Sequence, residues 1–265
     1  MTAEAANTIP GDVTDDAFLG GALAILQPRS GYRAGLDAVM LAATVPGESS
    51  RPLRVLDVGA GVGTAGLCVA RRIPSAEVVL LEREPLLATL AAENIRRNGL
   101  GDRVRVVNAA VGASAAELRA AGLAEESFGH VIANPPYHDV GAGTLAADVG
   151  KAAAHAMPDD ELDRWARFMA RMAAPRGRAT IVHKAQALQR VLAALDQRFG
   201  DTRILPLHPR PGDAAHRVIV EGVKGSRAPL QLLAGFVLHT DGNEFTPAAG
   251  AILRAGAPLP MSNSA

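Results

Sequence analysis

A short glycine-rich stretch, residues 54–66, constrains this chain more than any other feature. It begins with an apolar run interrupted by one acid, Asp57, and passes into glycines at positions 59, 61, 63 and 66. Residues 64–72 follow with helical character. The pattern predicts a buried strand, a tight turn and a helix start, where the glycines let a ligand approach the backbone and the helix start supplies free N–H donors. A small molecule is therefore expected to bind here.

Two ligand classes fit this stretch. Glycines 61, 63 and 66 spell G-x-G-x-x-G, and Glu82 follows Gly61 by 21 residues at the end of the next apolar run. This spacing matches the dinucleotide fingerprint, in which the distal acid binds the ribose hydroxyls of NAD. The spacing Asp57-x-Gly59-x-Gly61-x-Gly63 instead resembles the first motif of the S-adenosylmethionine-dependent methyltransferases, where the acid faces the amino-acid end of the cofactor. We favour S-adenosylmethionine over NAD, and a turn that binds no ligand is the third interpretation.

The charge balance bears on the partners of the chain. Lys plus Arg and Asp plus Glu number 27 each, so there is no net positive field to attract nucleic acid over the whole surface. Nearly all of the cations are arginines, so local phosphate-binding patches are compatible with the composition. Arg176, Arg210 and Arg217 are the candidates for such a patch.

Length and composition also limit the class of protein. The 265 residues, 48% of them hydrophobic, fit one α/β domain with an ample core. The single cysteine, Cys68, excludes an internal disulfide, and we expect it to be a small buried hydrophobe. No apolar stretch approaches a membrane span and the N-terminus lacks the features of a signal peptide, so we expect a cytoplasmic protein with no membrane partner.

Strands alternate with helices along the rest of the chain. The helix that follows Asp160 has an apolar stripe that includes Trp165, and we expect this stripe to be core. The alternation predicts an α/β fold with a doubly wound, mostly parallel sheet, whose strand C-termini and ligand share one edge. Extended runs are expected within 18–26 and at 103–107, 128–133, 179–182, 203–207 and 217–223, and helices at 38–44, 85–98 and 185–199.

The same pattern suggests domain boundaries. We divide the chain into a mobile tail at 1–16, a single domain at 17–255 with an N-terminal cap at 17–50, and a second tail at 256–265. The domain is expected to end with a pair of extended runs, near 230–238 and around Phe245. Residues 138–158, rich in Gly and Ala, are expected to form a lid or a substrate loop.

The tetrapeptide Asn134-Pro135-Pro136-Tyr137, directly after the predicted strand at 128–133, is a second motif. The prolines fix the backbone and remove its N–H donors, so a guest meets carbonyls and the Asn134 amide. A planar amine suits this arrangement, because its two N–H groups can donate to the Asn134 side-chain oxygen and the Pro135 carbonyl while its ring stacks on Tyr137. Two such acceptors favour a pyramidal nitrogen whose lone pair can attack a methyl group. The alternative is a rigid proline turn at a strand end.

The two motifs together resemble the amino-methyltransferases, which methylate adenine at N6 or glutamine in release factors. The N-terminal stretch narrows the resemblance. It is similar to the start of the tRNA (adenine-N6)-methyltransferase family that acts on a valine tRNA, often labelled predicted O-methyltransferase. The likeness covers roughly residues 15–250 and is carried by Gly21, Gln27-Pro28, Gly31-Tyr32-Arg33, Asp37-Ala38, Glu93-Asn94, Asn98-Gly99, His155, Pro175-Arg176-Gly177 and Arg217-Val218-Ile219-Val220.

The resemblance implies a seven-stranded class I methyltransferase fold of the Rossmann-like type, S-adenosylmethionine as cofactor and a tRNA as partner. It implies that Asn134, Pro135 and Tyr137 are the catalytic residues that hold the target amine. Asn108 departs from the family pattern, since an Asp usually reads the cofactor's adenine amine there and an Asn accepts with less charge. The implied cofactor-binding residues are Tyr32, Arg33, Asp57, Gly59, Gly61, Gly63, Glu82, Asn108 and Asn134, with Tyr32 and Arg33 capping the pocket.

Other chemistries fit the sequence less well. His130, His138, His155 and His183 lack metal-ligand spacing, so we expect surface or loop histidines and no metal. Asp139 alone would make a poor magnesium site. The alternative functions are a small-molecule O- or N-methyltransferase, a protein-glutamine methyltransferase and, in a different class, a non-catalytic nucleotide-binding module.

Overall fold

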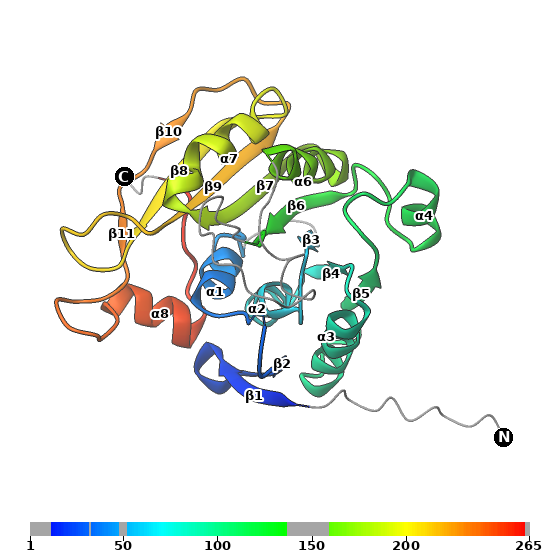
Figure 1. Ribbon diagram of the computed structural model, residues 1–265, viewed down its shortest axis with the longest axis horizontal. Coiled ribbons are helices and arrows are strands. Elements are labelled where there is room, and N and C mark those ends of the chain that lie inside the picture. The colour runs from blue at the N-terminus through cyan, green and yellow to red at the C-terminus, as the bar shows by residue number, and fades with distance from the viewer. Residues whose placement is uncertain (1–11, 32, 48–51, 137–158, 263–265) are drawn as a thin grey trace, which may run out of the picture.

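A central sheet of nine strands carries the chain's main body (Figure 1). The computed structural model describes residues 12–31, 33–47, 52–136 and 159–262, so the predicted loop at 138–158 lies outside the described residues. The strand order is β10-β8-β9-β7-β6-β3-β4-β5, with β11 also paired to β8. The strands are β3 (Arg54–Val58), β4 (Glu77–Glu82), β5 (Val104–Asn108), β6 (Phe128–Ala133), β7 (Ala173–Lys184), β8 (Phe199–His208), β9 (Arg217–Lys224), β10 (Gln231–Leu232) and β11 (Phe236–Val237).

The sheet is doubly wound and mostly parallel, which confirms the predicted fold class. Strands β5, β4, β3, β6 and β7 pair in parallel, and β9 inserts antiparallel between β7 and β8. The expected seven strands are all present, and β10 and β11 add two residues each. Of the two expected C-terminal runs, the one near 230–238 contains both β10 and β11, and each of these pairs with β8. The run expected around Phe245 forms no named strand in the described residues. A single bridge joins His239 to Phe245.

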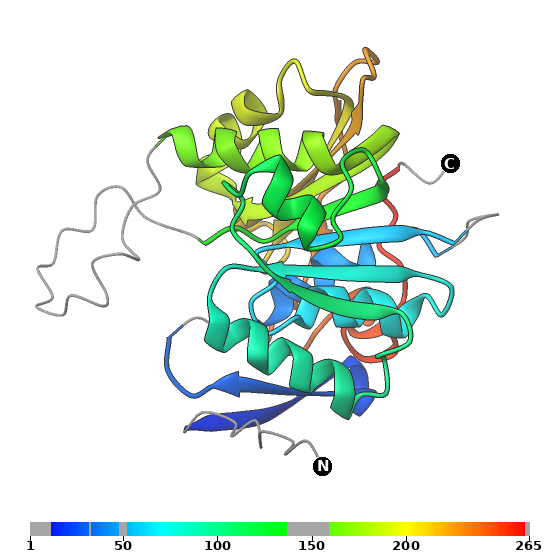
Figure 2. The same ribbon diagram turned by 90° about the vertical axis from the view of Figure 1, so that its right-hand side faces the viewer.

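Helices cover both faces of the sheet, as the two views show (Figures 1 and 2). One apolar core contains residues of α1 (Leu36–Ala43), α2 (Thr64–Arg72), α3 (Pro85–Arg97) and α8 (Pro247–Ala255). The other contains residues of α4 (Ala115–Ala120), α6 (Asp159–Met172) and α7 (Leu188–Leu195). Strands buried on both faces read as continuous apolar runs, as Val78–Leu81 in β4 does. Cys68 is buried on α2, as predicted.

The N-terminal cap is an antiparallel ribbon of β1 (Val13–Phe18) and β2 (Leu23–Pro28), with the short 3-10 helix η1 (Leu19–Gly21) at its turn. The extended runs expected within 18–26 are confirmed for β2, whereas β1 overlaps that range only at Phe18. The glycine is required, since Gly20 has a φ of 65° and a Cβ there would lie 2.6 Å from the Arg254 carbonyl oxygen. The ribbon lies beside α3 at the margin of the molecule (Figure 2).

Both predicted tails extend too far into ordered structure. β1 begins at Val13, inside the stretch 1–16 that was expected to be mobile. At the other end, Leu259 and Met261 are buried, and the Leu259 N–H donates to the Ala43 carbonyl at 2.8 Å. Strand pairing and burial of apolar side chains therefore order parts of both segments. Within the described ranges, no helix is long and apolar enough to cross a membrane.

Two histidines predicted at the surface or in loops are buried in strands instead. His130 on β6 and His183 on β7 are 1% and 5% exposed. His130 Nε2 lies 2.7 Å from Thr180 Oγ1, and Glu221 on β9 pairs with Arg178 nearby. Burial lowers the pKa of His130 to about 3 and that of His183 to about 4. Both rings are therefore neutral in the folded chain near pH 7.

Because of this burial, the unfolding free energy of the chain depends on pH. Between pH 6.5 and about 3, the unfolded chain binds a proton at His130 that the folded chain does not, so stability falls as pH falls. His130→Gln removes that site and keeps an amide for Thr180. We expect the unfolding free energy of the wild type, relative to this variant, to fall by about 2 kcal/mol between pH 6.5 and 5. Urea unfolding at both pH values measures this difference, and parallel pH curves for the two proteins would contradict it.

Candidate active site

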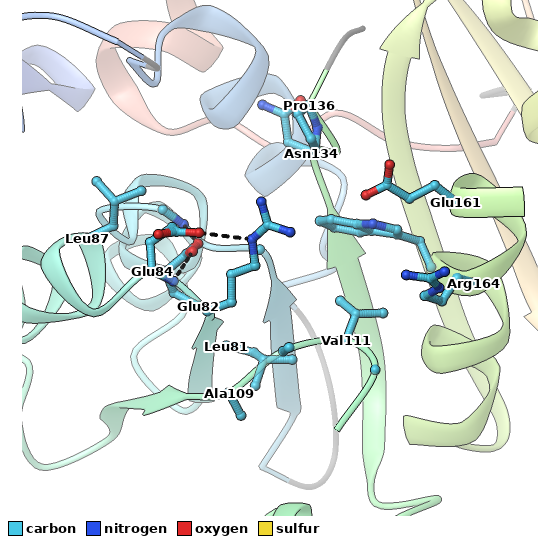
Figure 3. Close-up of a pocket in the computed structure, with 16 residues that line it drawn as sticks. Leu81, Glu82, Glu84, Leu87, Ala109, Val111, Asn134, Pro136, Glu161 and Arg164 are labelled. Carbon is cyan, nitrogen blue, oxygen red and sulfur yellow. Dashed lines mark hydrogen bonds and ion pairs between the residues drawn. The ribbon is translucent and has the colours of Figure 1, made fainter. Parts of the chain in front are cut away.

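A cavity of about 370 Å³ opens at the edge where the parallel strands end (Figure 3). Its walls come from the segments that follow β3, β4, β5 and β6 and from helix α6. The register explains the convergence: Val58 pairs with both Leu81 and Ala133, and Glu82 pairs with Asn108. The lining residues are Gly59, Gly61, Leu81, Glu82, Arg83, Glu84, Leu87, Ala109, Ala110, Val111, Gly112, Asn134, Pro136, Glu161, Arg164 and Trp165.

The predicted glycine loop forms one wall of this cavity. Gly59, with a φ of 66°, meets Trp165 so closely that a Cβ would lie 2.3 Å from the ring atom Cη2. Gly61 also lines the cavity. Gly63 does not line it: this residue is the left-handed N-cap of α2, and a Cβ there would lie 2.7 Å from Leu80 Cδ1. The glycines therefore divide between cavity wall and core packing.

Glu82 lies where the sequence predicted it, at the end of β4 and in the cavity wall. Its carboxylate accepts the Gly61 N–H at 2.7 Å and the Glu84 N–H at 2.9 Å, and the residue is only 6% exposed. A carboxylate has about four acceptor sites, so two backbone donors leave capacity for hydroxyl groups of a ligand. Glu82 thus positions the loop and presents acceptor oxygens to the cavity.

Asp57 differs from the expectation that it faces the cofactor. It is 2% exposed, does not line the cavity, and accepts the Gly66 N–H at 2.8 Å. Burial raises the pKa of Asp57 to about 7; the Gly66 hydrogen bond opposes this shift, and the charge of Glu82 adds to it. Asp57 therefore stabilises the first turn of α2 through a backbone hydrogen bond.

Asn108 also acts on the backbone. Its amide donates to the Glu82 carbonyl at 2.8 Å and to the Arg83 carbonyl at 3.0 Å, which ties the end of β5 to the end of β4. Asn108 does not line the cavity, and residues 109–112 do so in its place. These four residues could not be predicted from the sequence, because they are uncharged and follow the strand without a motif.

Asn134 and Pro136 line the cavity directly after β6, between the side of Glu84 and Leu87 and the side of Glu161 and Arg164 (Figure 3). Pro135 between them is buried. Ala133 pairs with Val58, so Asn134 and Gly59 leave adjacent strands side by side. The two predicted motifs therefore meet in one cavity. Tyr137, predicted to stack on the target, lies outside the described residues.

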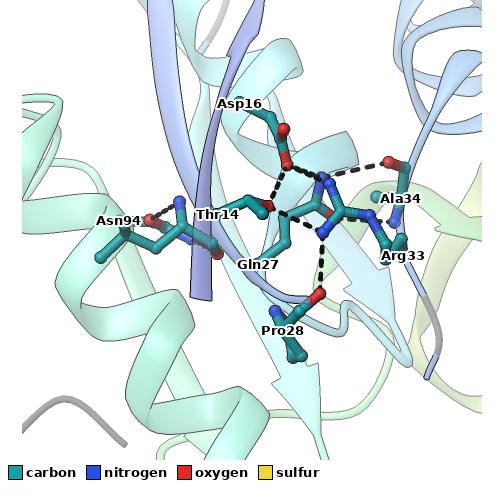
Figure 4. Close-up of polar contacts among 8 residues, drawn as sticks. Thr14, Asp16, Gln27, Pro28, Arg33, Ala34 and Asn94 are labelled. Carbon is teal, nitrogen blue, oxygen red and sulfur yellow. Dashed lines mark hydrogen bonds and ion pairs between the residues drawn. The ribbon is translucent and has the colours of Figure 1, made fainter. Parts of the chain in front are cut away.

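Arg33 holds the cap together and does not line the cavity (Figure 4). Its guanidinium donates to Asp16 at 2.5 Å, to Thr14 Oγ1 at 2.7 Å and to the Pro28 carbonyl at 2.8 Å. These bonds differ from the expectation that Arg33 caps the cofactor pocket. Tyr32, the other predicted capping residue, lies outside the described residues.

The structural role of Asn94 was not predicted from the sequence. This fully buried side chain on α3 accepts the Leu26 N–H at 2.8 Å, donates to the Leu26 carbonyl at 3.0 Å, and donates to the Val62 carbonyl at 3.0 Å. It therefore joins the cap strand β2 to the glycine loop. A polar residue within an otherwise apolar helix face was the available signal.

Helix α6 contributes a wall that was not predicted. Glu161, Arg164 and Trp165 all line the cavity, although Trp165 was expected to be core alone. Trp165 is 8% exposed and belongs to the apolar core as well, so the prediction was incomplete. Residues three and four apart share a helix face, so the spacing of these residues carried the signal.

The three arginines proposed as a phosphate patch do not lie together. Arg217 starts β9 opposite Lys184, at the cavity edge of β7, and pairs with Asp37 at 2.9 Å. Arg210 follows β8 at this same edge and donates to Asn243 at 2.9 Å. Arg176 lies near the start of β7, at the opposite edge. The prediction that all three arginines form one phosphate-binding patch is therefore wrong.

Comparisons with known proteins agree with this geometry. Residues 36–162 match the family model of the methyltransferase small domain. A crystal structure from Agrobacterium tumefaciens, named a predicted O-methyltransferase, is 32% identical, covers 86% of this chain and 100% of its own, and superposes with a TM-score of 0.71. The Pyrococcus horikoshii TYW2 structure, in complex with MeSAdo, is 13% identical, covers 82% of this chain and 73% of its own, and shares the fold with a TM-score of 0.52.

Curated relatives carry one recurring name, tRNA1(Val) (adenine(37)-N6)-methyltransferase. The Bacteroides fragilis protein is 37% identical over 107 residues, which are 40% of this chain and 41% of that protein. The Porphyromonas gingivalis protein is 25% identical over 193 residues, 71% of this chain and 73% of that protein. The chain thus spans less than half the length of the first curated relatives it matches.

The position of Asp57 generates a test. If its oxygen only supports the Gly66 N–H, Asp57→Asn keeps an acceptor there, and S-adenosylmethionine affinity at pH 8 should stay within about threefold of wild type. Asp57→Ala leaves that buried N–H unpaired and should lower the unfolding free energy by about 1–3 kcal/mol. Calorimetric titration and urea unfolding measure the two effects. A tenfold loss of affinity in the Asn variant alone would restore a direct contact between this carboxylate and the cofactor.

Proposed function

Because the chain belongs to the S-adenosylmethionine-dependent methyltransferases, with a methyltransferase small domain, we propose that it methylates the N6 amine of an adenine in tRNA. The observation that carries the proposal is the meeting of the two motifs in one cavity. Glu82 and Gly61 lie on one side, and Asn134 lies beside Gly59 where β6 and β3 end. A cofactor site and an amine site are thereby adjacent.

The residues of the cavity fit S-adenosylmethionine. Its volume of about 370 Å³ lies in the ordinary range of small-molecule pockets, about 300–1,000 Å³. Glu82 offers acceptors for ribose hydroxyls, and Gly59 and Gly61 present bare backbone to a ligand. Leu87 and Val111 supply apolar surface for a base. When bound, this cofactor supplies an electrophilic methyl group on a sulfonium centre.

The residues after β6 orient the nucleophile. The Asn134 side-chain oxygen and the Pro135 carbonyl accept the two hydrogens of the target amine, and Pro135 and Pro136 offer no competing N–H. Acceptors on both hydrogens free the nitrogen lone pair from conjugation and direct it into the cavity. The chain contributes to the rate chiefly by position, since a neutral thioether leaves without acid assistance.

The choice of tRNA adenine rests on the names of the curated relatives and on the amine-binding motif. An adenine must leave its stack to reach a cavity of this kind. Lys184, Arg210 and Arg217 lie at the same sheet edge, where cations can contact phosphate, and Arg217 is paired there with Asp37. O-methylation is the second candidate reaction, favoured by the name of the Agrobacterium structure.

The cofactor proposal predicts a preference between two ligands. We expect the purified chain to bind S-adenosylmethionine and not NAD. Glu82→Ala removes the ribose acceptor and the support of the Gly61 amide, so affinity should fall by about 1.5–3 kcal/mol. Titration calorimetry measures the ligand preference of the wild type and the affinity of the variant. It is done at a temperature where circular dichroism shows that the variant is folded. Tighter binding of NAD than of S-adenosylmethionine would reject the assignment.

The amine site predicts a separate loss of turnover. With unmodified tRNA and saturating cofactor, Asn134→Ala should lower turnover by two orders of magnitude or more, about 3 kcal/mol, as when one preorganised polar group is lost. Cofactor affinity should change little. Asn108→Ala is the matched control, an asparagine at the end of β5 on the same sheet edge that bonds only backbone carbonyls in the described residues, and it should leave turnover within about threefold.

Release of the thioether product and the methyl content of the tRNA are the readouts. Near-wild-type turnover by Asn134→Ala would mean that the tetrapeptide is a rigid turn, and O-methylation would then replace amine methylation as the proposed reaction. O-methylation would also replace amine methylation if the chain methylated a small hydroxyl compound and no RNA.

A further inference from the structure

Trp165 is the only tryptophan of the chain, and it lies where the core meets the cavity. Its ring points an edge at the glycine loop: a Cβ on Gly59 would lie 2.3 Å from Cη2, 3.0 Å from Cζ3 and 3.4 Å from Cζ2. The two faces of the indole ring therefore point away from Gly59. Because the residue also lines the cavity, the indole offers aromatic surface to a ligand.

The ring lies close to the point where the methyl group must be transferred. Val58 and Ala133 are paired across β3 and β6, so Gly59 and Asn134 are neighbours at the sheet edge. Trp165 contacts Gly59, and Asn134 holds the target amine in the proposed function. The reactive centre of the cofactor must be within bonding reach of that amine. It therefore lies beside Trp165, away from the ribose end marked by Glu82.

The charge of that centre decides what an indole can do for it. S-adenosylmethionine carries a positive sulfonium, whereas its product S-adenosylhomocysteine carries a neutral thioether and differs from it only by the loss of the methyl group and its charge. Aromatic faces attract cations, tryptophan most strongly, and the attraction increases where water is excluded. Trp165 is 8% exposed, so little of the ring is in contact with water.

We propose that Trp165 lies against the sulfonium of the bound cofactor and makes the site discriminate the cationic substrate from the neutral product. This inference rests on the proposed cofactor but not on tRNA as the acceptor. The ring favours the charged form before transfer and loses that attraction afterwards, which aids product release. Glu161 on the same helix and Glu84 across the cavity are the acidic groups that offer a competing explanation.

The test compares two ligands on three variants. Trp165→Leu keeps apolar bulk without an aromatic face, and Trp165→Phe keeps a smaller face. Titration calorimetry gives the affinities for S-adenosylmethionine and S-adenosylhomocysteine. We expect Trp165→Leu to weaken the sulfonium ligand about three- to tenfold more than the thioether, and Trp165→Phe to show a smaller difference of the same sign. Glu161→Gln is the charge control and should weaken the two ligands equally.

The wild-type chain also reports on the site directly, because all of its tryptophan fluorescence comes from Trp165. Binding of either ligand should change this emission. Equal weakening of both ligands by Trp165→Phe and Trp165→Leu would overturn the inference, as would a sulfonium-specific loss in Glu161→Gln. If Trp165→Leu fails to fold, Trp165→Phe decides. A wild-type chain that binds neither ligand overturns the proposed function itself.

Discussion

The pairing of β3 with a parallel strand on each side is the interaction on which the rest of the structure depends. Val58 at its end is in register with Leu81 of β4 and Ala133 of β6. Parallel strands bury both faces and end at one edge, so the residues that follow each strand share a single space. Glu82 and Asn134, far apart in sequence, thereby line one cavity with the glycine loop. A shift of register by one residue would separate them.

Buried polar groups hold this edge in shape. Glu82 and Asp57 accept backbone N–H groups from the glycine loop and the first turn of α2. Asn94 reaches the same loop through the Val62 carbonyl and ties it to the cap ribbon. Each group satisfies backbone atoms that would otherwise be buried without partners, at a cost of about 1–3 kcal/mol apiece. The cap is therefore part of the scaffold of the candidate site, even where its own residues do not line the cavity.

Helix α6 serves the core and the cavity together. It packs against β6, β7 and α7, and its apolar stripe fills the core on that face of the sheet. Trp165, in the same stripe, contacts the glycine loop. Gly59 is then required for two reasons, a left-handed backbone and contact with the indole ring. Packing of the core thus sets the position of an aromatic wall in the site.

The sequence by itself determined the fold class and the two motifs, because strand and helix periods, glycine turns and paired prolines are local signals. Glu82 and Asn134 could be named from it, since each directly follows or ends an apolar strand. The tertiary structure alone decided the roles of Asp57, Asn108 and Arg33, whose hydrogen bonds go to backbone or cap groups. It also decided that His130 is buried and that Arg176 lies at the far edge. Side-chain partners depend on which elements pack together, and sequence spacing carries no record of contacts between distant segments.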